Sequence, residues 1–379
     1  MAAKLKLGIL GGGGDSLIGI LHRVASYMFD RYELIGGVFN ADWDESLAFA
    51  RELGLQPERI YKDLDTLITE EKRLPEEERI QVISVLTPNF LHFQMAKQLL
   101  ENRFHVICEK PLTTTYQEAL VLQEMLVKSQ TVFAVTYTYT GYPMVRQIRE
   151  MITEGMLGEI QKIDIQYYQG WLNPIIHDKK KRATVWRLNP EQAGISSCIG
   201  DIGTHAFNMA EYLSGLEVKE ILADLNYLYE ENRMDLDGTV LLRFSKNVKG
   251  LLRASQIATG EENNLKVMIY GEKAGIKWEQ ENPNSVYFME EGQPLKVLRS
   301  GNHYNSELSL DGTKLPPGHP EGIFDAMANI YKGVAKAIDH EEFHPGEFPT
   351  LRDGLRGMNF IEKTVESHKK GNIWMEIDN

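Results

Sequence analysis

The sequence predicts a two-domain protein, with a doubly wound α/β domain in residues 1–140 and an α+β domain in residues 141–379. Three observations predict this organisation. A chain of 379 residues is longer than a single hydrophobic core usually serves. As far as about residue 135, short apolar runs alternate with longer amphipathic segments, which is the rhythm of βαβ units. After about residue 158 the sequence becomes dense in strand-like segments.

The predicted strands of the first domain are apolar throughout, as expected of parallel strands buried on both faces. They are residues 5–10, 33–39, 82–86, 105–108 and 132–136. The segments between them carry apolar residues at helical spacing, in residues 19–29, 44–53, 91–102 and 116–129. An acidic insert, residues 69–79, is expected to form a solvated surface helix and loop.

The second domain is expected to contain a large, mostly antiparallel sheet. Its strands alternate apolar and polar residues, as in Ile163-Asp164-Ile165-Gln166-Tyr167, which indicates one buried and one wet or helix-covered face. The predicted strands are residues 160–168, 218–229, 238–244, 250–256, 265–270, 275–279 and 286–289. The predicted helices are residues 204–213, 322–339 and 351–368, and the last two could pack back on the first domain. An open sheet face also predicts self-association into a homo-oligomer, a dimer or a tetramer.

Composition excludes several classes of function. Hydrophobic residues make up 42% and charged residues 25% of the chain, which is typical of a folded globular protein. The net charge of −13 disfavours nucleic acid and anionic membranes as partners. No uncharged run approaches the roughly 20 residues of a membrane span. Two cysteines, Cys108 and Cys198, and an N-terminus without a signal-peptide pattern lead us to expect a cytoplasmic protein.

A glycine-rich segment follows the first predicted strand and precedes the first predicted helix. Glycines in this setting let the backbone approach a pyrophosphate at a helix N-terminus, as in a dinucleotide-binding Rossmann domain. Gly11-x-Gly13 matches half of the fingerprint, but Gly19 comes three residues later than G-x-G-x-x-G requires. A tight turn without a ligand is the alternative, which the strand-loop-helix context makes weaker. The candidate pyrophosphate contacts are Gly11, Gly13, Gly14, Asp15, Ser16 and Leu17.

The end of the second predicted strand favours NAD over NADP. The segment Phe39-Asn40-Ala41-Asp42-Trp43-Asp44-Glu45 carries three carboxylates, and no Lys or Arg occurs before Arg51. A ribose hydroxyl suits such a corner and a 2′-phosphate does not. Asn40 or Asp42 is therefore the expected ribose contact. Asp42 could equally cap the following helix, and the two roles are compatible.

Three further motifs occur in order along the chain. They are Thr87-Pro88-Asn89-Phe90-Leu91-His92, Glu109-Lys110-Pro111, and Asp201-Ile202-Gly203-Thr204-His205 with Val185-Trp186-Arg187 before it. Together with chain length and domain rhythm, they resemble the Gfo/Idh/MocA oxidoreductases over essentially the whole chain. The resemblance implies a Rossmann domain, a nicotinamide cofactor and a polyhydroxylated small-molecule substrate.

The resemblance also implies the roles of particular residues. Lys110, Asp201 and His205 correspond to the catalytic and substrate-binding set of the family. Thr87, Pro88, Asn89 and His92 would line the nicotinamide and its ribose, Glu109 and Lys110 would also contact the cofactor, and Trp186 with Arg187 would close over it. We add Thr138 to the cofactor contacts. The segment Tyr137–Pro143 departs from the family pattern, which leaves its substrate contacts open.

The residue types suit the oxidation of a secondary alcohol. An imidazole titrates near neutrality and can take the hydroxyl proton, so His205 is the candidate base. Asp201 can orient His205 and bind a neighbouring hydroxyl, and Lys110 can stabilise a developing alkoxide. The alternatives are a solvated strand end for Lys110, a helix cap for Asp201 and an ordinary helix histidine for His205. The additional substrate candidates are Tyr139, Trp171 and His319.

Other features of the sequence suggest no further chemistry. The spacing of the histidines does not call for zinc or iron, so no metal is expected. Cys198 is interpreted as a small apolar residue, and His177-Asp178-Lys179-Lys180-Lys181-Arg182 as a solvated loop.

The sequence therefore predicts an NAD-dependent dehydrogenase that oxidises a secondary hydroxyl of a neutral sugar, glycoside or cyclitol. Three alternatives stay open: a glycosidase that retains NAD and acts by oxidation and elimination, a reductase of another unsaturated bond such as an imine, and a non-catalytic dinucleotide or sugar sensor.

Overall fold

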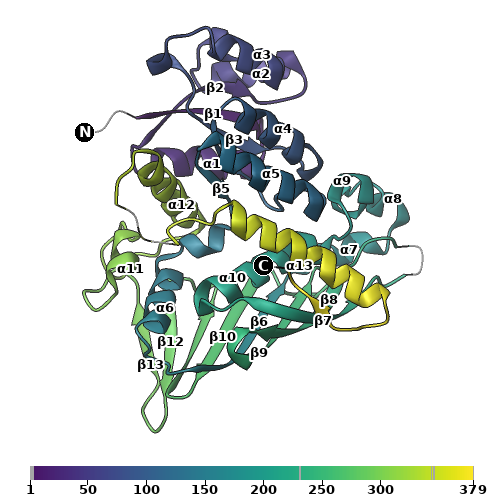
Figure 1. The fold of residues 1–379 in the computed structure, drawn as a ribbon, viewed down its shortest axis with the longest axis vertical. Helices are drawn as coiled ribbons and strands as arrows, with labels where there is room; N and C mark the ends of the chain where they lie inside the picture. The colour runs from purple at the N-terminus through teal and green to yellow at the C-terminus, as the bar shows by residue number, and fades with distance from the viewer. Residues whose placement is uncertain (1–3, 230–231, 343, 345, 379) are drawn as a thin grey trace. The chain divides into compact units, whose positions relative to one another are not determined.

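The computed structural model describes residues 4–229, 232–342, 344 and 346–378 (Figure 1). The chain divides into two compact units. The first unit consists of Met1–Thr113, Gln117–Gly141 and Ile323–Gly354. The second unit consists of Thr114–Tyr116, Tyr142–Gly322 and Leu355–Asn379. A segment from late in the sequence thus completes the first unit.

A five-stranded parallel sheet forms the centre of the first unit, and this confirms the predicted fold class. The strand order is β2-β1-β3-β4-β5. The strands are β1 (Leu5–Gly11), β2 (Tyr32–Val38), β3 (Val82–Leu86), β4 (His105–Cys108) and β5 (Phe133–Val135). The strand order reverses direction between β1 and β3, and in such sheets ligands bind outside the carboxyl ends of the strands at that point.

Helices cover both faces of this sheet. Figure 1 shows α1 and α12 together on one side and α4 and α5 on the other. The helices are α1 (Leu17–Tyr27), α2 (Trp43–Glu52), α3 (Leu64–Glu71), α4 (Asn89–Glu101), α5 (Tyr116–Ser129) and α12 (Ile323–Ile338), with short 3₁₀ turns at Pro57–Arg59, Glu76–Glu78 and Thr138–Gly141.

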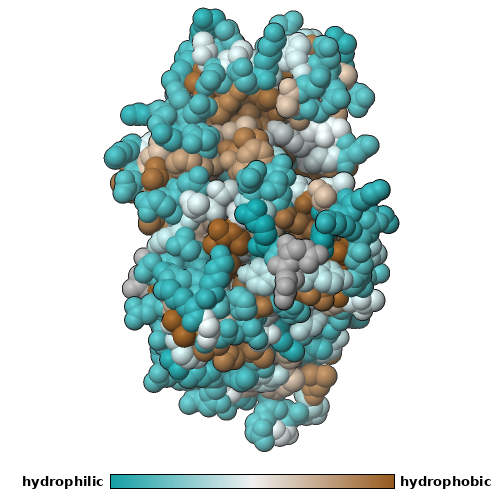
Figure 2. All heavy atoms as spheres, turned by 90° about the vertical axis from the view of Figure 1, so that its right-hand side faces the viewer, coloured by the Kyte–Doolittle hydropathy of each residue, from teal (hydrophilic) through white to brown (hydrophobic). Residues whose placement is uncertain are grey.

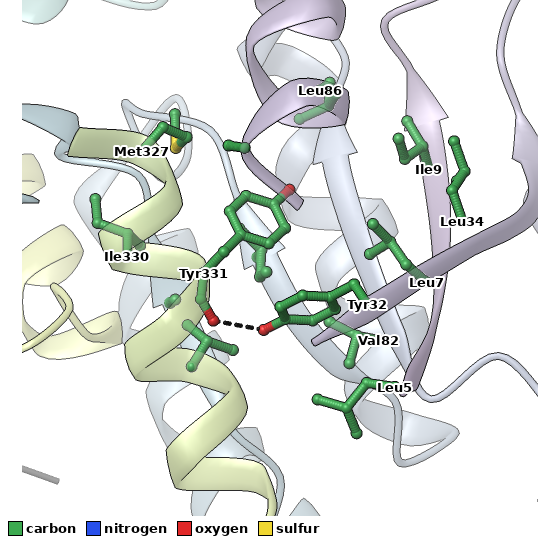
Figure 3. Close-up of a cluster of buried hydrophobic side chains, with 14 of the residues drawn as sticks. Leu5, Leu7, Ile9, Tyr32, Leu34, Val82, Leu86, Met327, Ile330 and Tyr331 are labelled. Atoms are coloured by element: carbon green, nitrogen blue, oxygen red, sulfur yellow. Dashed lines mark hydrogen bonds between the residues drawn. The ribbon is translucent and has the colours of Figure 1, made fainter. Parts of the chain in front are cut away.

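Helix α12 supplies a large part of the first core. Its residues Met327, Ile330 and Tyr331 are buried among apolar side chains of β1, β2 and β3 (Figure 3). The hydroxyl of Tyr32 donates a hydrogen bond of 2.7 Å to the backbone carbonyl of Tyr331. Strand β2 and helix α12 are thereby tied together although about 300 residues separate them in the sequence.

The acidic insert is less solvated than the sequence predicts. Glu71, the last residue of α3, is fully buried. Its carboxylate accepts hydrogen bonds from the Arg59 guanidinium at 2.8 Å, the Tyr61 hydroxyl at 2.6 Å and the Ile80 amide at 2.7 Å. A buried carboxylate is tolerated when it is paired and hydrogen-bonded in this way.

The second unit contains the predicted mostly antiparallel sheet, with nine strands in the order β13-β12-β11-β10-β6-β9-β8-β7-β14. Only β6 and β9, among the pairs described, run parallel. The strands are β6 (Ile160–Tyr168), β7 (Val218–Asn226), β8 (Asp237–Phe244), β9 (Lys249–Ser255), β10 (Asn264–Gly271), β11 (Ala274–Glu279), β12 (Ser285–Glu290), β13 (Lys296–Arg299) and β14 (Met375–Glu376). β13 is an addition to the predicted set.

Helices cover one face of this sheet. Phe207 of α10 (Thr204–Ser214) stacks on Phe360 of α13 (Leu351–Lys369), with ring centroids 4.4 Å apart. Tyr142, which precedes α6 (Pro143–Thr153), packs on Trp278 of β11. The remaining short elements are α7 (Asn173–Ile176), α8 (Lys179–Arg182), α9 (Pro190–Ala193), α11 (Glu307–Asp311), the 3₁₀ turns Trp186–Leu188 and Ser245–Asn247, and the π-helical turn Ile199–Gly203.

The surface agrees with the composition of the chain. On the face drawn in Figure 2, hydrophilic side chains predominate and hydrophobic residues are exposed in separate patches. Within the described ranges, no helix combines the length and the apolarity needed to span a bilayer.

A buried ion pair joins two helices of the second unit, and its removal should destabilise that unit. Arg356 of α13 donates to both carboxylate oxygens of Glu211 in α10, at 2.7 and 2.6 Å, and to the carbonyl of Val218. Arg356→Met leaves this carboxylate buried without its cation, so we expect a loss of about 3–5 kcal/mol. Chemical denaturation measures the effect.

Lys370→Met is the matched control, because it removes an exposed partner of Glu366 at the end of the same helix. It should cost less than about 0.5 kcal/mol. Equal losses of stability in the two variants would show that the ion pair between Arg356 and Glu211 does not stabilise the contact of α13 with α10.

Candidate functional site

The glycine loop lies at the carboxyl end of β1, in the first unit. Helix α1 begins at Leu17, two residues before the predicted start, and Ser16 is its N-cap. The loop is therefore closed before Gly19, which lies in the first turn of the helix. A side chain at Gly19 would put its Cβ 1.9 Å from the Gly12 carbonyl oxygen, and one at Gly13 would lie 2.6 Å from the Phe39 carbonyl oxygen. The first close approach explains why the late glycine, Gly19, is needed, and the second explains Gly13.

Side chains of Arg23, in α1, and of Ser16, its N-cap, form hydrogen bonds that hold the loop in place. The Arg23 guanidinium donates a hydrogen bond of 2.6 Å to the Gly12 carbonyl, and the Ser16 hydroxyl accepts one from the Gly19 amide at 3.2 Å. Gly14 and Asp15 complete the turn, and a Cβ at Gly14 would meet nothing within 4 Å. The open backbone beside a helix N-terminus is a cradle that fits a pyrophosphate.

The corner after β2 presents carboxylates, as predicted. Asp42 is the N-cap of α2, and its Oδ1 accepts hydrogen bonds from the amides of Asp44 and Glu45. The capping role is thus confirmed, and Oδ2 makes no hydrogen bond within the described part of the chain. The Asn40 amide donates to Glu45 at 2.6 Å, and its oxygen accepts from the Asp42 amide.

The ends of β3 and β4 lie next to the loop at the same edge of the sheet. Helix α4 begins at Asn89, with Pro88 at its N-cap position. His92, in the first turns of α4, is buried, and its ring nitrogens lie 2.7 Å from the Thr87 carbonyl and 3.0 Å from the Pro111 carbonyl. Burial lowers the pKa of His92. This histidine therefore ties the turn after β3 to the turn after β4.

The turn after β4 carries Glu109 and Lys110. The Glu109 carboxylate accepts hydrogen bonds from His22 at 3.0 Å, from the Thr136 hydroxyl at 2.6 Å and from the Lys110 backbone amide at 3.2 Å. Burial by itself would raise the pKa of Glu109, but the hydrogen bond and charge of His22, the charge of Lys110 and the Thr136 hydroxyl lower it to about 2. Lys110 is half-buried and is followed by a cis peptide bond to Pro111.

In the second unit, a turn formed by residues 197–205 presents Asp201 and His205. Part of it, Ile199–Gly203, is π-helical, a conformation often found at functional sites. The carboxylate of Asp235 is fully buried and accepts hydrogen bonds from the amides of Ser197 at 2.9 Å and Ile199 at 2.8 Å. Burial raises the pKa of Asp235, although these two amides oppose the shift. Asp235 therefore fixes the backbone of the turn.

Asp201 is held by two side chains at its Oδ2. Its Oδ2 lies 3.0 Å from the Arg187 guanidinium and accepts a hydrogen bond of 2.9 Å from the Gln256 amide, which is fully buried. The N-cap of α10 is Gly203, so the alternative in which Asp201 caps this helix is wrong.

His205 is the second residue of α10 and packs against the ring of Tyr167, with centroids 6.2 Å apart. A row of polar groups continues from there. The Tyr167 hydroxyl and the Gln169 amide both donate to Asn263, at 2.6 and 2.8 Å, and the Trp171 indole donates to Gln169 at 3.0 Å. His205 and Trp171, both predicted from sequence, thus belong to one connected wall in the second unit.

The remaining predicted residues are distributed as follows. Tyr139 and Thr138 are buried in the turn after β5, in the first unit. Trp186 is partly exposed and lies under the Arg187 guanidinium, 4.6 Å from it. His319 is exposed and its ring contacts the Pro316 carbonyl. Residues 179–182 form the short helix α8, capped by Asp178, where the sequence predicts a loop.

The sequence analysis did not identify several residues that hold the candidate site residues of the two units in place. His22, Arg23 and Tyr331 support the first unit's site, and Asp235 and Gln256 support the turn in the second. None of them lies in a motif that we used, because their roles depend on contacts between distant segments. Among the described residues, no cluster of three or more His, Cys, Asp or Glu is arranged to hold a metal ion.

Comparisons with known proteins agree with both units. Residues 5–137 match the family model described as an oxidoreductase family with an NAD-binding Rossmann fold, and residues 145–277 match the GFO/IDH/MocA C-terminal domain. The uncharacterized oxidoreductase YfiI of Bacillus subtilis strain 168 is 31% identical over 386 residues, covering 100% of this chain and 98% of that protein.

Two further relatives have named ligands or substrates. The crystal structure of an inositol dehydrogenase homolog from Azotobacter vinelandii, complexed with NADH and myo-inositol, has a TM-score of 0.90 and 31% identity, covering 99% of this chain and 98% of that one. The levoglucosan dehydrogenase of Pseudarthrobacter phenanthrenivorans is 26% identical over 332 residues, covering 79% of this chain and 80% of that protein.

The glycine contact in α1 gives a test of the dinucleotide loop. In Gly19→Ala the new methyl group would collide with the Gly12 carbonyl, so the loop must move away from α1. We expect NADH affinity, measured by fluorescence titration, to fall by at least about tenfold. The control is Gly322→Ala, where the added Cβ meets nothing within 4 Å. Unchanged affinity in Gly19→Ala would show that the loop does not bind the dinucleotide.

Proposed function

Because this chain belongs to the Gfo/Idh/MocA family of oxidoreductases, we propose that it is an NAD-dependent dehydrogenase of neutral sugars, glycosides or cyclitols. It oxidises a secondary hydroxyl to a ketone or catalyses the reverse reduction. The observation that carries the proposal is the braced turn of residues 197–205. There the buried Asp235 and Gln256 fix Asp201, and the turn leads directly into His205.

In the proposed reaction, each of three side chains has one role. His205 accepts the proton of the reacting hydroxyl and returns it in the reverse direction. Asp201, held at Oδ2 by Gln256 and Arg187, accepts a hydrogen bond from a neighbouring hydroxyl and fixes the orientation of the ring. Lys110 stabilises negative charge on the reacting oxygen. NAD, when bound, supplies the acceptor for the hydride.

A neutral polyhydroxylated substrate suits the groups around Asp201. Amide, phenol and indole side chains line the wall that includes Gln169, Asn263 and Trp171, and such groups exchange hydrogen bonds with hydroxyls. Arg187 is already paired with Asp201. The names of the inositol dehydrogenase homolog and the levoglucosan dehydrogenase point to the same substrate class.

We propose NAD rather than NADP as the cofactor. Oδ2 of Asp42 is available to a ribose hydroxyl, and the neighbouring carboxylates of Asp44 and Glu45 would repel a 2′-phosphate. Lys62, whose ammonium lies 5.7 Å from the centre of the Trp43 ring, is a cation close to this corner. Comparison of kcat/KM with NAD and with NADP tests this preference, and NAD should give the higher value.

A turnover assay tests the proposal directly. The purified protein with NAD should generate NADH absorbance with members of a panel of sugars, glycosides and inositols, and not with hexose phosphates alone. Lys110→Ala and His205→Ala should each lower kcat/KM by about 10²- to 10⁴-fold, because the charge stabilisation or the base is lost.

Two variants of matched type serve as controls, Lys128→Ala on the exposed side of α5 and His303→Ala in an exposed loop. Wild-type turnover in Lys110→Ala and His205→Ala would sink the site assignment. Release of an aglycone without net NADH would instead identify the glycosidase alternative. Dinucleotide binding with no turnover on any substrate, accompanied by ligand-dependent binding of a protein partner, would identify a sensor.

We also propose that the protein is a homo-oligomer formed through the outer face of the nine-stranded sheet. Strand pairing aligns Leu222, Leu241 and Leu251 in one row across β7, β8 and β9. The rows beside it carry charges: Glu220 pairs with Arg243 on one side, and Asp224, Thr239 and Arg253 are aligned in register on the other. An apolar stripe with charges of both signs beside it can pack against a second copy of itself.

Light scattering tests this interface. The wild-type protein should be a dimer or tetramer, and Leu241→Lys should shift it towards monomer, because a lysine ammonium would have to be desolvated in the apolar stripe. Val127→Lys, on the exposed surface of α5, should leave the mass unchanged. A monomeric wild-type protein at working concentration would contradict the proposal.

Both cysteines are buried free thiols, which supports the proposed location in the reducing cytoplasm.

A further inference from the structure

We infer that His22 is a positioning residue, which acts through Glu109 to hold the turn that carries Lys110 and to couple this turn to the dinucleotide loop. The inference deepens the proposed function and rests on it to the extent that Lys110 is the catalytic cation. All the residues involved lie in the first unit.

Both oxygens of the Glu109 carboxylate accept hydrogen bonds. Oε1 accepts from His22 Nε2 at 3.0 Å and from Thr136 Oγ1 at 2.6 Å, and Oε2 accepts from the backbone amide of Lys110 at 3.2 Å. The position of this carboxylate therefore fixes the backbone at Lys110. His22 is the only one of these three donors whose side chain is an ionisable ring, and it is fully buried.

His22 is itself held in place by a hydrogen bond on its other ring nitrogen. Its Nδ1 lies 2.8 Å from the Tyr331 hydroxyl, which in turn lies 2.7 Å from the hydroxyl of Ser84. Tyr331 is itself held by the hydrogen bond from Tyr32 to its backbone carbonyl (Figure 3). A continuous line of hydrogen bonds thus runs from β3 through α12 and α1 to the end of β4. With both nitrogens engaged, the imidazole has one orientation.

Helix α1 connects this line of hydrogen bonds to the glycine loop. His22 and Arg23 are consecutive residues of α1. While His22 bonds Glu109, the Arg23 guanidinium bonds the Gly12 carbonyl at 2.6 Å. One turn of one helix therefore holds both the loop that would bind the pyrophosphate and the turn that carries Lys110. A dinucleotide that orders the loop would order Lys110 as well, and the converse follows by linkage.

The charge of Glu109 depends on its hydrogen-bond donors. Glu109 is held ionised by its donors against the effect of burial, and its pKa is lowered to about 2. The titratable and charged groups that face it are His22 from α1, Lys110 beside it, Cys108 of β4, His92 of α4 and, through His22, Tyr331 of α12. Because the pKa is lowered, the wild-type carboxylate stays charged from neutral pH down to well below its unfolded value. Without the His22 donor, the effect of burial is less opposed and the pKa of Glu109 rises.

Two nearly isosteric variants separate the roles of the two ring nitrogens. In His22→Gln the amide nitrogen takes the place of Nε2 and can still donate to Glu109. In His22→Asn it takes the place of Nδ1, so the contact with Tyr331 is kept and the donor to Glu109 is lost. NADH affinity from fluorescence titration and, with an accepted substrate, kcat/KM are measured for both variants as a function of pH.

We expect His22→Asn to lower kcat/KM by about 10- to 100-fold, as for a lost hydrogen bond to a charged group. It should also make NADH affinity pH-dependent: the affinity should fall as the pH is lowered, because Glu109 then takes up a proton at a higher pH than in the wild type. His22→Gln should keep the flat wild-type profile. Tyr61→Phe removes a buried hydrogen bond to Glu71 in the same unit that involves neither His22 nor Glu109, so it should lower thermal stability and leave the pH profile unchanged.

Matching pH profiles for His22→Asn and wild type would overturn the inference, and so would an acidic decline in Tyr61→Phe. If His22→Asn does not fold, the pH profile of His22→Gln decides the role of the Nε2 donor. A flat profile like that of the wild type supports this role, and an acidic decline contradicts it. The NADH titration needs no sugar. A panel in which no substrate is oxidised would therefore sink the proposed function while this measurement still decides the role of His22.

Discussion

A buried carboxylate must have its oxygens hydrogen-bonded, and the candidate residues of each unit are held in place by a carboxylate of this kind. Glu109 in the first unit and Asp235 in the second are each buried, and each collects donors from segments far away in the sequence. In both cases one of those donors is a backbone amide of the turn that presents a candidate catalytic side chain. The carboxylates therefore organise the chemistry without being its reacting groups.

This arrangement gives the presenting turns rigidity where loops would ordinarily be mobile. The Lys110 turn is held by Glu109 and, through His92, by the turn after β3. The turn before His205 is held by Asp235 at two amides. A polar side chain that must align with a substrate gains more from such support than from its own contacts, because misplacement by about 1 Å can cost a large factor in rate.

The same device recurs where no chemistry is proposed. Glu71 joins α3 to Arg59 and to the segment before β3, and Glu211 joins α10 to α13. Buried carboxylates are thus a general means of closing this fold. What distinguishes Glu109 and Asp235 is their place beside candidate site residues, at the carboxyl edge of a parallel sheet or at a π-helical turn. Burial by itself would not have singled them out.

Local patterns in the sequence were enough to predict most helices and strands and those candidate residues that lie in short motifs. The apolar runs of the parallel strands, the alternation in β6, the glycines after β1 and the motifs around Lys110 and Asp201 all depend on neighbours in the chain, so their periodicity and spacing were visible. Only the tertiary structure decided which distant side chains support them. His22, Tyr331, Asp235 and Gln256 carry no local pattern, and the buried Glu71 lies in a segment whose composition indicates solvent. The physical reason is that a hydrogen bond between strands and helices far apart in sequence leaves no periodicity in either segment.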